Sequence, residues 1–160
     1  MRWLVLLCLL SVVVAGCGAS LATGGGAGSE KQKLENACVK AWKQVLGAES
    51  GLHAAARIHQ SGNPELPRAN VEKIGEPAGE ASSAWTTASE VARSLGYASL
   101  AGVMARAASD YGEVQFDLSP EGGGYEATEK VLSQASAADS EVARAAREHG
   151  LSACAGPAAG

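Results

Sequence analysis

Aromatic side chains are scarce in this sequence. They make up 4% of its 160 residues, whereas alanine and glycine are abundant. Because a core built mainly from alanine and valine buries little apolar area per residue, the sequence predicts one thin domain of modest stability. Basic residues are also in the minority, with 13 Lys and Arg against 17 Asp and Glu. An acidic chain is poorly suited to nucleic acid, so we expect no nucleic-acid partner.

Signatures of common catalytic and cofactor sites are missing as well. No Gly-x-Ser-x-Gly elbow for a nucleophilic serine occurs. Glycines alternate at Gly24, Gly26 and Gly28, but no strand precedes them and no lysine closes a phosphate-binding loop. The sequence therefore predicts neither an enzyme nor a cofactor.

The histidines and the acidic residues are not arranged as metal ligands. His53 and His59 are six positions apart, whereas two ligands on one helix need a spacing of four. His149 is expected at the opposite end of the domain from His59. We therefore predict no metal site and interpret the histidines as solvated or helix-end residues.

One group of carboxylates lies at helical spacing. The residues share one face of a predicted helix, where paired carboxylates can do acid–base work or hold a cation. Without an apolar wall to separate their pKa values, a solvated helix face is the interpretation we adopt. They are Asp110, Glu113 and Asp117, with Glu121 beyond.

The amino terminus carries an export signal. Met1 and Arg2 precede an apolar run, mostly leucine and valine, over residues 3–14. This run is shorter than the roughly 20 residues that span a bilayer, which suits a signal peptide over residues 1–16. Two alternatives remain: an uncleaved membrane anchor, because residues 3–22 are nearly free of strongly polar groups, and a signal peptide cleaved elsewhere.

The end of this run resembles the lipobox of bacterial lipoproteins. Its residues are Val14-Ala15-Gly16-Cys17, a branched apolar residue and two small residues before a cysteine. The resemblance implies cleavage after Gly16 and a diacylglyceryl group on the sulfur of Cys17. Two acyl chains give stable attachment to a membrane lipid layer. The expected location is the extracytoplasmic face of the cell membrane.

The composition of the remaining chain indicates three parts: a tether, a folded domain and a tail. Residues 17–29 are expected to form the lipidated cysteine and a flexible tether of Gly, Ala and Ser. Residues 30–155 form the predicted domain and residues 156–160 a flexible tail. Cys8 leaves with the signal peptide and Cys17 takes the lipid, so Cys38 and Cys154 remain in an oxidising compartment. We predict that they form a disulfide.

Four segments of the domain show the apolar period of amphipathic helices, and none alternates as a strand would. A capping box, Ser29 with Gln32, opens the first, which ends at residues 61–64. Asn70 is the expected cap of the second, Gly96 its end, and Pro77 inside it predicts a kink or a break. The apolar seams are Leu34, Cys38, Ala41, Val45, Ala48, Leu52, Ala55, His59; Val71, Ile74, Ala78, Ala81, Trp85, Ala88, Ala92, Leu95; Leu100, Val103, Ala107, Tyr111, Val114, Leu118; and Val131, Ala135, Ala138, Val142, Ala145, His149.

The third helix is expected from Ser99 to the turn at residues 119–124. Gly150 with Leu151 is typical of a Schellman motif at the end of the fourth. Four such helices on short connections predict an all-α, up-down-up-down bundle. In that topology the start of the first helix and the end of the fourth lie at the same end, which brings Cys38 and Cys154 together.

The large aromatic residues form one further grouping. Counting antiparallel from each turn places Trp42, Trp85 and Tyr111 in one layer of the half nearest the anchor. Such a layer is either the best-packed part of the core or the wall of an apolar groove for a small apolar or aromatic ligand.

Several features together resemble small exported lipoproteins of actinobacteria: the lipobox, the Ala-rich helices, the segment Asn36–Trp42 and the segment Gly150–Ala155. The resemblance implies no catalytic residues. The function we expect is a non-enzymatic, membrane-anchored helical module that binds a protein of the cell envelope, with the outer turns at residues 61–67 and 119–124 as contact points. The alternative is a small-ligand binder that uses the aromatic layer.

Overall fold

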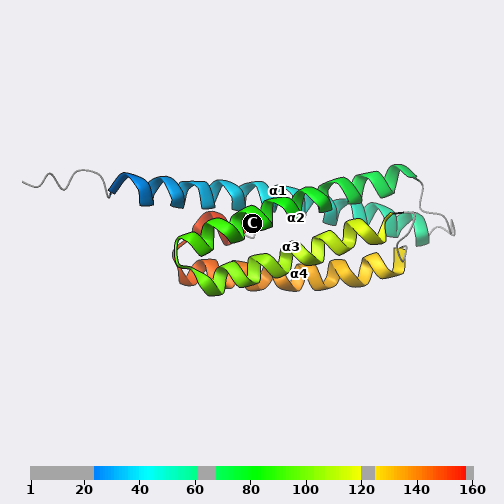
Figure 1. Ribbon diagram of the computed structural model, residues 1–160. Helices are drawn as coiled ribbons and strands as arrows, with labels where there is room; N and C mark the ends of the chain where they lie inside the picture. Colours follow the sequence, from blue (N-terminus) through cyan, green and yellow to red (C-terminus); the bar gives the residue numbers. More distant parts are fainter. Residues whose placement is uncertain (1–23, 61–67, 120–124, 158–160) are drawn as a thin grey trace, which may run out of the picture.

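The computed structural model describes residues 24–60, 68–119 and 125–157, which form a bundle of four α-helices (Figure 1). No strand occurs among these residues. The predicted all-α, four-helix bundle with one disulfide is confirmed. Its elements are α1 (Gly24–Gln60), α2 (Arg68–Ser94), α3 (Ala98–Asp117), α4 (Tyr125–Glu148) and the short 3-10 helix η1 (Ser152–Cys154).

The helices pack in the order of the chain, and Figure 1 shows them running alternately up and down the bundle. α1 packs on α2, α2 on α3, and α3 on α4. In the described part of the chain, α1 and α4 are not a closely packed pair. The element that joins them is η1, which contacts both helices at one end of the bundle.

Helix α1 begins five residues earlier than the sequence predicts. It starts at Gly24, so residues 24–29 belong to the helix and not to a flexible tether; residues 17–23 lie outside the described residues. The Ser29–Gln32 capping box is also wrong, because both residues are inside the helix and Gln32 Nε2 donates to Asn36 Oδ1 at 3.1 Å. Once a helix is nucleated, each added residue gains a hydrogen bond, which offsets a glycine penalty of about 1 kcal/mol. The first turns of α1 project beyond the other helices (Figure 1).

Helix α2 continues through Pro77, so the predicted break does not occur. A proline cannot donate to the carbonyl four residues before it, here that of Lys73. At this place α1 carries two glycines, and a Cβ atom on Gly51 would lie 2.8 Å from that carbonyl oxygen. A Cβ on Gly47 would lie 3.2 Å from Pro77 Cβ. The two glycines thus allow α1 to approach α2 closely where the proline interrupts the hydrogen bonds.

This close approach gives opposite expectations for two glycine substitutions. Gly51→Ala should lower the free energy of unfolding by about 1–3 kcal/mol, because the new methyl group meets backbone atoms that cannot give way. Gly102→Ala is the matched control. Its Cβ meets nothing within 4 Å, so the higher helix propensity of alanine should raise stability by about 1 kcal/mol. Urea unfolding measures both; equal effects of the two substitutions would contradict this account of the α1–α2 contact.

Two glycines end helices as predicted. Gly96 and Gly150 have φ angles of 82° and 66°, the left-handed conformation that glycine adopts at little cost. The amide of Leu151 donates to Ala146 O at 2.9 Å, the long hydrogen bond of a Schellman motif. After Gly96, the amide of Tyr97 donates the equivalent hydrogen bond to Ala92 O in α2, also at 2.9 Å.

The start of α2 differs from the prediction. The helix begins at Arg68, so Asn70 is inside it and does not cap it.

The core follows the predicted apolar seams of all four helices, although five seam residues are only partly buried: Leu52, Leu95, Val103, Leu118 and Val131. Asp139 and Thr128 on α4 and Ser89 on α2 are buried although they are polar. His149, which the seam of the fourth helix included, is exposed. The side chains of Ala55, His59 and Val71 lie outside the described residues. The seam residues that are fully or nearly fully buried are Leu34, Cys38, Ala41, Val45, Ala48, Ile74, Ala78, Ala81, Trp85, Ala88, Ala92, Leu100, Ala107, Tyr111, Val114, Ala135, Ala138, Val142 and Ala145.

Candidate functional site

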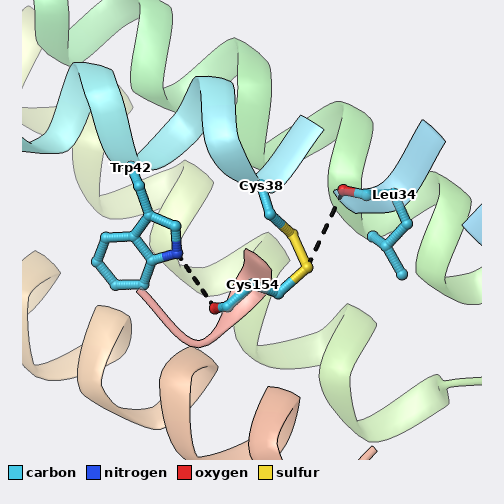
Figure 2. Close-up of a disulfide and its surroundings, with 4 residues drawn as sticks. All are labelled: Leu34, Cys38, Trp42 and Cys154. Atoms are coloured by element: carbon cyan, nitrogen blue, oxygen red, sulfur yellow. Dashed lines mark hydrogen bonds between the residues drawn. A yellow bond between two sulfur atoms is a disulfide. The ribbon is translucent and has the colours of Figure 1, made fainter. Parts of the chain in front are cut away.

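The predicted disulfide joins α1 to η1 (Figure 2). Cys38 and Cys154 lie 116 residues apart in the sequence, and their sulfur atoms are 2.04 Å apart. Both residues are fully buried. The carbonyl oxygen of Leu34 lies 4.0 Å from Cys154 Sγ, a packing contact because a disulfide sulfur carries no hydrogen to donate. The bond closes the bundle at the end where α1 begins.

Trp42 holds the segment after η1 against α1. Its Nε1 donates to the carbonyl oxygen of Cys154 at 3.1 Å, as Figure 2 shows. Gly156 then passes over the indole, where a Cβ atom would lie 3.3 Å from Trp42 Cζ2. Gly156 also has a φ angle of 88°, which disfavours any other residue. The chain up to Pro157 is therefore fixed beside Trp42, although residues 156–160 were expected to be a flexible tail.

The three aromatic residues singled out from the sequence lie close together but in different surroundings. Trp42 and Trp85 meet edge to face, with ring centroids 5.4 Å apart. Trp85 and Tyr111 are fully buried in the core, whereas Trp42 is half-buried. Of the three, only Trp42 lines a cavity described in this structure.

Asp139 contacts Tyr111 of this aromatic group, and the sequence analysis did not single it out. Tyr111 Oη donates to Asp139 Oδ2 at 2.6 Å, and the carboxylate is only 4% exposed. A signal was present in the sequence: Asp139 lies four residues after Ala135 and three before Val142, on the apolar face of α4. A charged residue at such a position is seldom fully buried without a reason.

Burial raises the pKa of Asp139 to about 7. The hydrogen bond from Tyr111 and the nearby indole of Trp85 lower it, while the negative charges of Glu49 and Asp110 raise it. The indole faces the carboxylate without the geometry of a full hydrogen bond: within the described residues, Trp85 Nε1 and Asp139 Oδ1 have no hydrogen-bond partner. Burial, followed by the Asp139 charge, raises the pKa of Tyr111 far above its usual value.

Three hollows lie along α1, the first between α1 and the chain around η1, and the other two between α1 and α4. The first, of about 550 Å³, lies beside Trp42 and is lined by Val39, Lys43, Leu46, Ala153, Gly156 and Pro157. The second, of about 260 Å³, shares Trp42, Leu46, Gly156 and Pro157 with the first and has Asp139 and Glu49 in its wall. The third, of about 310 Å³, lies farther along and includes Leu52, His53, Glu129 and Leu132. The second and third hollows occur where α1 and α4 do not pack closely.

The other sequence candidates do not converge on a site. Burial and the charge of Glu113 raise the pKa of Asp110, whereas Arg106 lowers it. Glu113 is exposed, and Asp117 is half-buried. His53 is exposed, and the ring of His149 lies 4.7 Å from that of Tyr97. Among the described residues no three His, Cys, Asp or Glu side chains are grouped to hold a metal ion.

The residues of the expected anchor, including Cys17, lie outside the described part of the chain. Within the part that is described, no helix combines the length and the apolar character needed to cross a membrane. Comparison with known proteins finds no matching family model, no similar curated protein and no similar solved structure.

Proposed function

We propose that this chain is an exported lipoprotein, held by a lipid on Cys17, whose helical domain is a non-enzymatic binding module at the outer face of the cell membrane. The observation that carries the proposal is the sequence Val14-Ala15-Gly16-Cys17 at the end of a short apolar run. The domain that follows supports it. Cys38 and Cys154 are paired, and such structural disulfides belong to oxidising compartments outside the cytoplasm.

The distribution of charge also supports an anchor at this end of the bundle. From the end of the bundle where α1 begins to the level of Lys43, eight exposed basic residues outnumber five acidic ones. An excess of Lys and Arg is attracted to anionic lipid, by about 1 kcal/mol for each residue near the surface. The basic residues are Lys31, Lys33, Lys40, Lys43, Arg93, Arg106, Arg144 and Arg147, and the acidic ones are Glu30, Glu35, Glu90, Glu141 and Glu148.

The opposite end of the bundle is acidic. There the described side chains include eight carboxylates and only three basic groups. This end faces away from the membrane in the proposed orientation and remains in water. The carboxylates are Glu49, Glu76, Glu80, Asp110, Glu113, Asp117, Glu129 and Asp139, and the basic residues are Arg57, Lys73 and Lys130.

A protein of the cell envelope is the proposed partner of the domain. Val39 and Leu46 on α1 are 58% and 50% exposed, and they flank the half-buried Trp42. Exposed apolar side chains grouped in this way are typical of binding surfaces. The outer turns expected as contacts, residues 61–67 and 119–124, lie outside the described residues except for Ser119. Pull-down from detergent-solubilised membranes with Cys17 intact is the experiment that identifies the partner.

Lipidation at Cys17 gives an all-or-none expectation. In a bacterial host fed an alkyne analogue of palmitate, the wild-type chain should take up label and Cys17→Ser should not, because the acyl chains need the sulfur. Cys8→Ser is the matched control; it removes a cysteine that leaves with the signal peptide, and it should label as the wild type does. Label retained by Cys17→Ser, or absent from the wild type, would refute the anchor.

A second candidate function is the binding of a small apolar ligand beside Trp42. The observation that favours it is the hollow of about 550 Å³ with Val39, Leu46 and Pro157 in its wall. Because Trp85 and Tyr111 are buried, this groove would use Trp42 with the chain that follows η1, and not the whole aromatic layer.

A further inference from the structure

We infer that the groove beside Trp42, between α1 and the chain around η1, binds a single-chain amphiphile with a carboxylate head group. The alkyl chain lies along Val39 and Leu46 on α1, and the carboxylate pairs with the ammonium group of Lys43. This inference rests on the second candidate function and deepens it by naming the class of ligand. It does not depend on the lipid anchor or on a partner protein.

The apolar wall of the groove provides the first part of the argument. Val39 and Leu46 are 58% and 50% exposed, and together with Phe116 they are the exposed large hydrophobic side chains of the described residues. Both line this one groove. They are two helical turns apart on the same face of α1, about 10 Å along its axis. An alkyl chain laid along this face removes both side chains from water, which favours binding.

The opposite wall of the groove is held in place by covalent and hydrogen bonds. It consists of Ala153, Gly156 and Pro157. The disulfide of Cys154 and the bond from Trp42 Nε1 to Cys154 O attach this part of the chain to α1 (Figure 2). The volume of about 550 Å³ is within the range of small-ligand sites. Because the walls are fixed before binding, a ligand does not have to order them.

The charge of the groove determines the head group. Lys43 is the one charged residue in its described lining, and no aspartate or glutamate lines it. Lys43 is exposed, and its ammonium group forms no ion pair with any described residue. Its four-carbon stem is flexible, so the ammonium can meet an anion at the edge of the groove. A single ammonium balances one negative charge, which a carboxylate supplies.

The neighbouring hollow of about 260 Å³ fixes the direction of the ligand. It shares Trp42 and Leu46 with the groove but has Glu49 and Asp139 in its wall. These carboxyl groups disfavour an anion on that side. The head group therefore stays at Lys43, and the alkyl chain extends toward Trp42.

The test uses n-octanoate as the probe, with 1-octanol as its neutral counterpart and n-octylammonium as its cationic one. The protein is the chain from residue 17 onward with Cys17→Ser, which retains every described residue. Tryptophan fluorescence reports binding, because only Trp42 and Trp85 remain in this chain. Octanoate should bind about fivefold more tightly than octanol, the gain expected from one favourable surface ion pair, and octylammonium should bind more weakly than octanol.

Lys43→Gln tests the pairing with the head group. The affinity for octanoate should fall about fivefold, to that of octanol, while the affinity for octanol stays the same. Lys31→Gln is the matched control, because it removes an exposed lysine from the same helix outside the groove and should leave octanoate binding unchanged. Unchanged octanoate binding in Lys43→Gln, or equal affinity of the unsubstituted groove for octanoate and octanol, would overturn the inference.

Leu46→Ser tests the position of the alkyl chain. It should weaken octanoate and octanol alike, by about fivefold or more, because the lost methyl and methylene groups contact the chain in both ligands. Phe116→Ser is the matched control; this side chain is 57% exposed and lies near the end of α3, away from the groove. Neither substitution removes a core residue, and circular dichroism confirms that both variants are folded. Octanoate binding that is unaffected by Leu46→Ser would contradict the assigned position.

The outcomes separate this inference from the second candidate function on which it rests. Octanol and octanoate that bind equally, both weakened by Leu46→Ser, would overturn the carboxylate head group and leave an apolar site. No binding of any of the three probes would overturn both. Vesicles of phosphatidylglycerol provide the last arm. Vesicle binding that Lys43→Gln and Leu46→Ser weaken, with no binding of octanoate, would assign this face to a membrane surface and overturn the inference.

Discussion

Replacing Cys38 by serine should lower the free energy of unfolding by about 4–5 kcal/mol, the largest loss we expect from one substitution. The disulfide closes a loop with a sequence separation of 116 residues, and in the chain-entropy model a loop of that size restricts the unfolded chain by this amount. For a domain of this size, the thermal midpoint should fall on the order of 10–20 °C.

The fold gives a second reason why loss of the disulfide should destabilise the domain strongly. Among the described residues, α1 and α4 are not a closely packed pair, and η1 is the element that contacts both. The disulfide and the bond from Trp42 Nε1 to Cys154 O are what attach η1 to α1. Without the disulfide, the hydrogen bond and local packing alone must hold this end of the bundle closed.

Controls distinguish the covalent bond from the loss of a buried sulfur. Cys154→Ser should destabilise by a similar amount, and the double variant should cost little more than either single one, because each removes the same cross-link. A thiol reductant should lower the wild-type midpoint toward that of the variants and leave the double variant unchanged. A wild-type midpoint equal to that of Cys38→Ser under non-reducing conditions would show that the disulfide does not stabilise the domain.

The features that sequence alone predicted are those with a local or a topological cause. The apolar seams follow from helix periodicity, and Gly96 and Gly150 end helices because a left-handed residue is needed there. The pairing of Cys38 with Cys154 follows from the up-down order of four helices, which places the beginning of the first helix beside the end of the last.

The features that sequence did not predict depend on contacts between helices. Pro77 should interrupt a helix judged by itself, yet α2 continues, and the glycines of α1 that face it could be recognised only once the two helices were aligned. The burial of Asp139 has the same origin. Its environment is made by α1, α2 and α3, so its own helix gives no measure of how far it is removed from water.

Asp139 should make the domain less stable as the pH rises, the opposite of the usual behaviour of a paired carboxylate. Burial raises the pKa of Asp139 to about 7, whereas an exposed aspartate in the unfolded chain has a value near 4. Between these values the folded state keeps a proton that the unfolded state has released. The contribution of Asp139 to stability is therefore fully present below about pH 4 and is lost progressively up to about pH 7.

The size of this loss makes it measurable. About three pKa units correspond to about 4 kcal/mol, and the side chain is so deeply buried that solvent screening reduces this little. In Asp139→Asn the part of the slope between pH 4 and pH 7 that Asp139 causes should disappear, and at pH 8 the variant should be more stable than the wild type by a few kcal/mol. Glu148→Gln, which neutralises an exposed carboxylate of the same helix, should keep the slope.

Urea unfolding at four or five pH values measures all three chains. A wild-type stability that rises from pH 4 to pH 7 as much as that of Asp139→Asn would show that Asp139 is ionised in the folded domain, held by partners stronger than Tyr111 and Trp85.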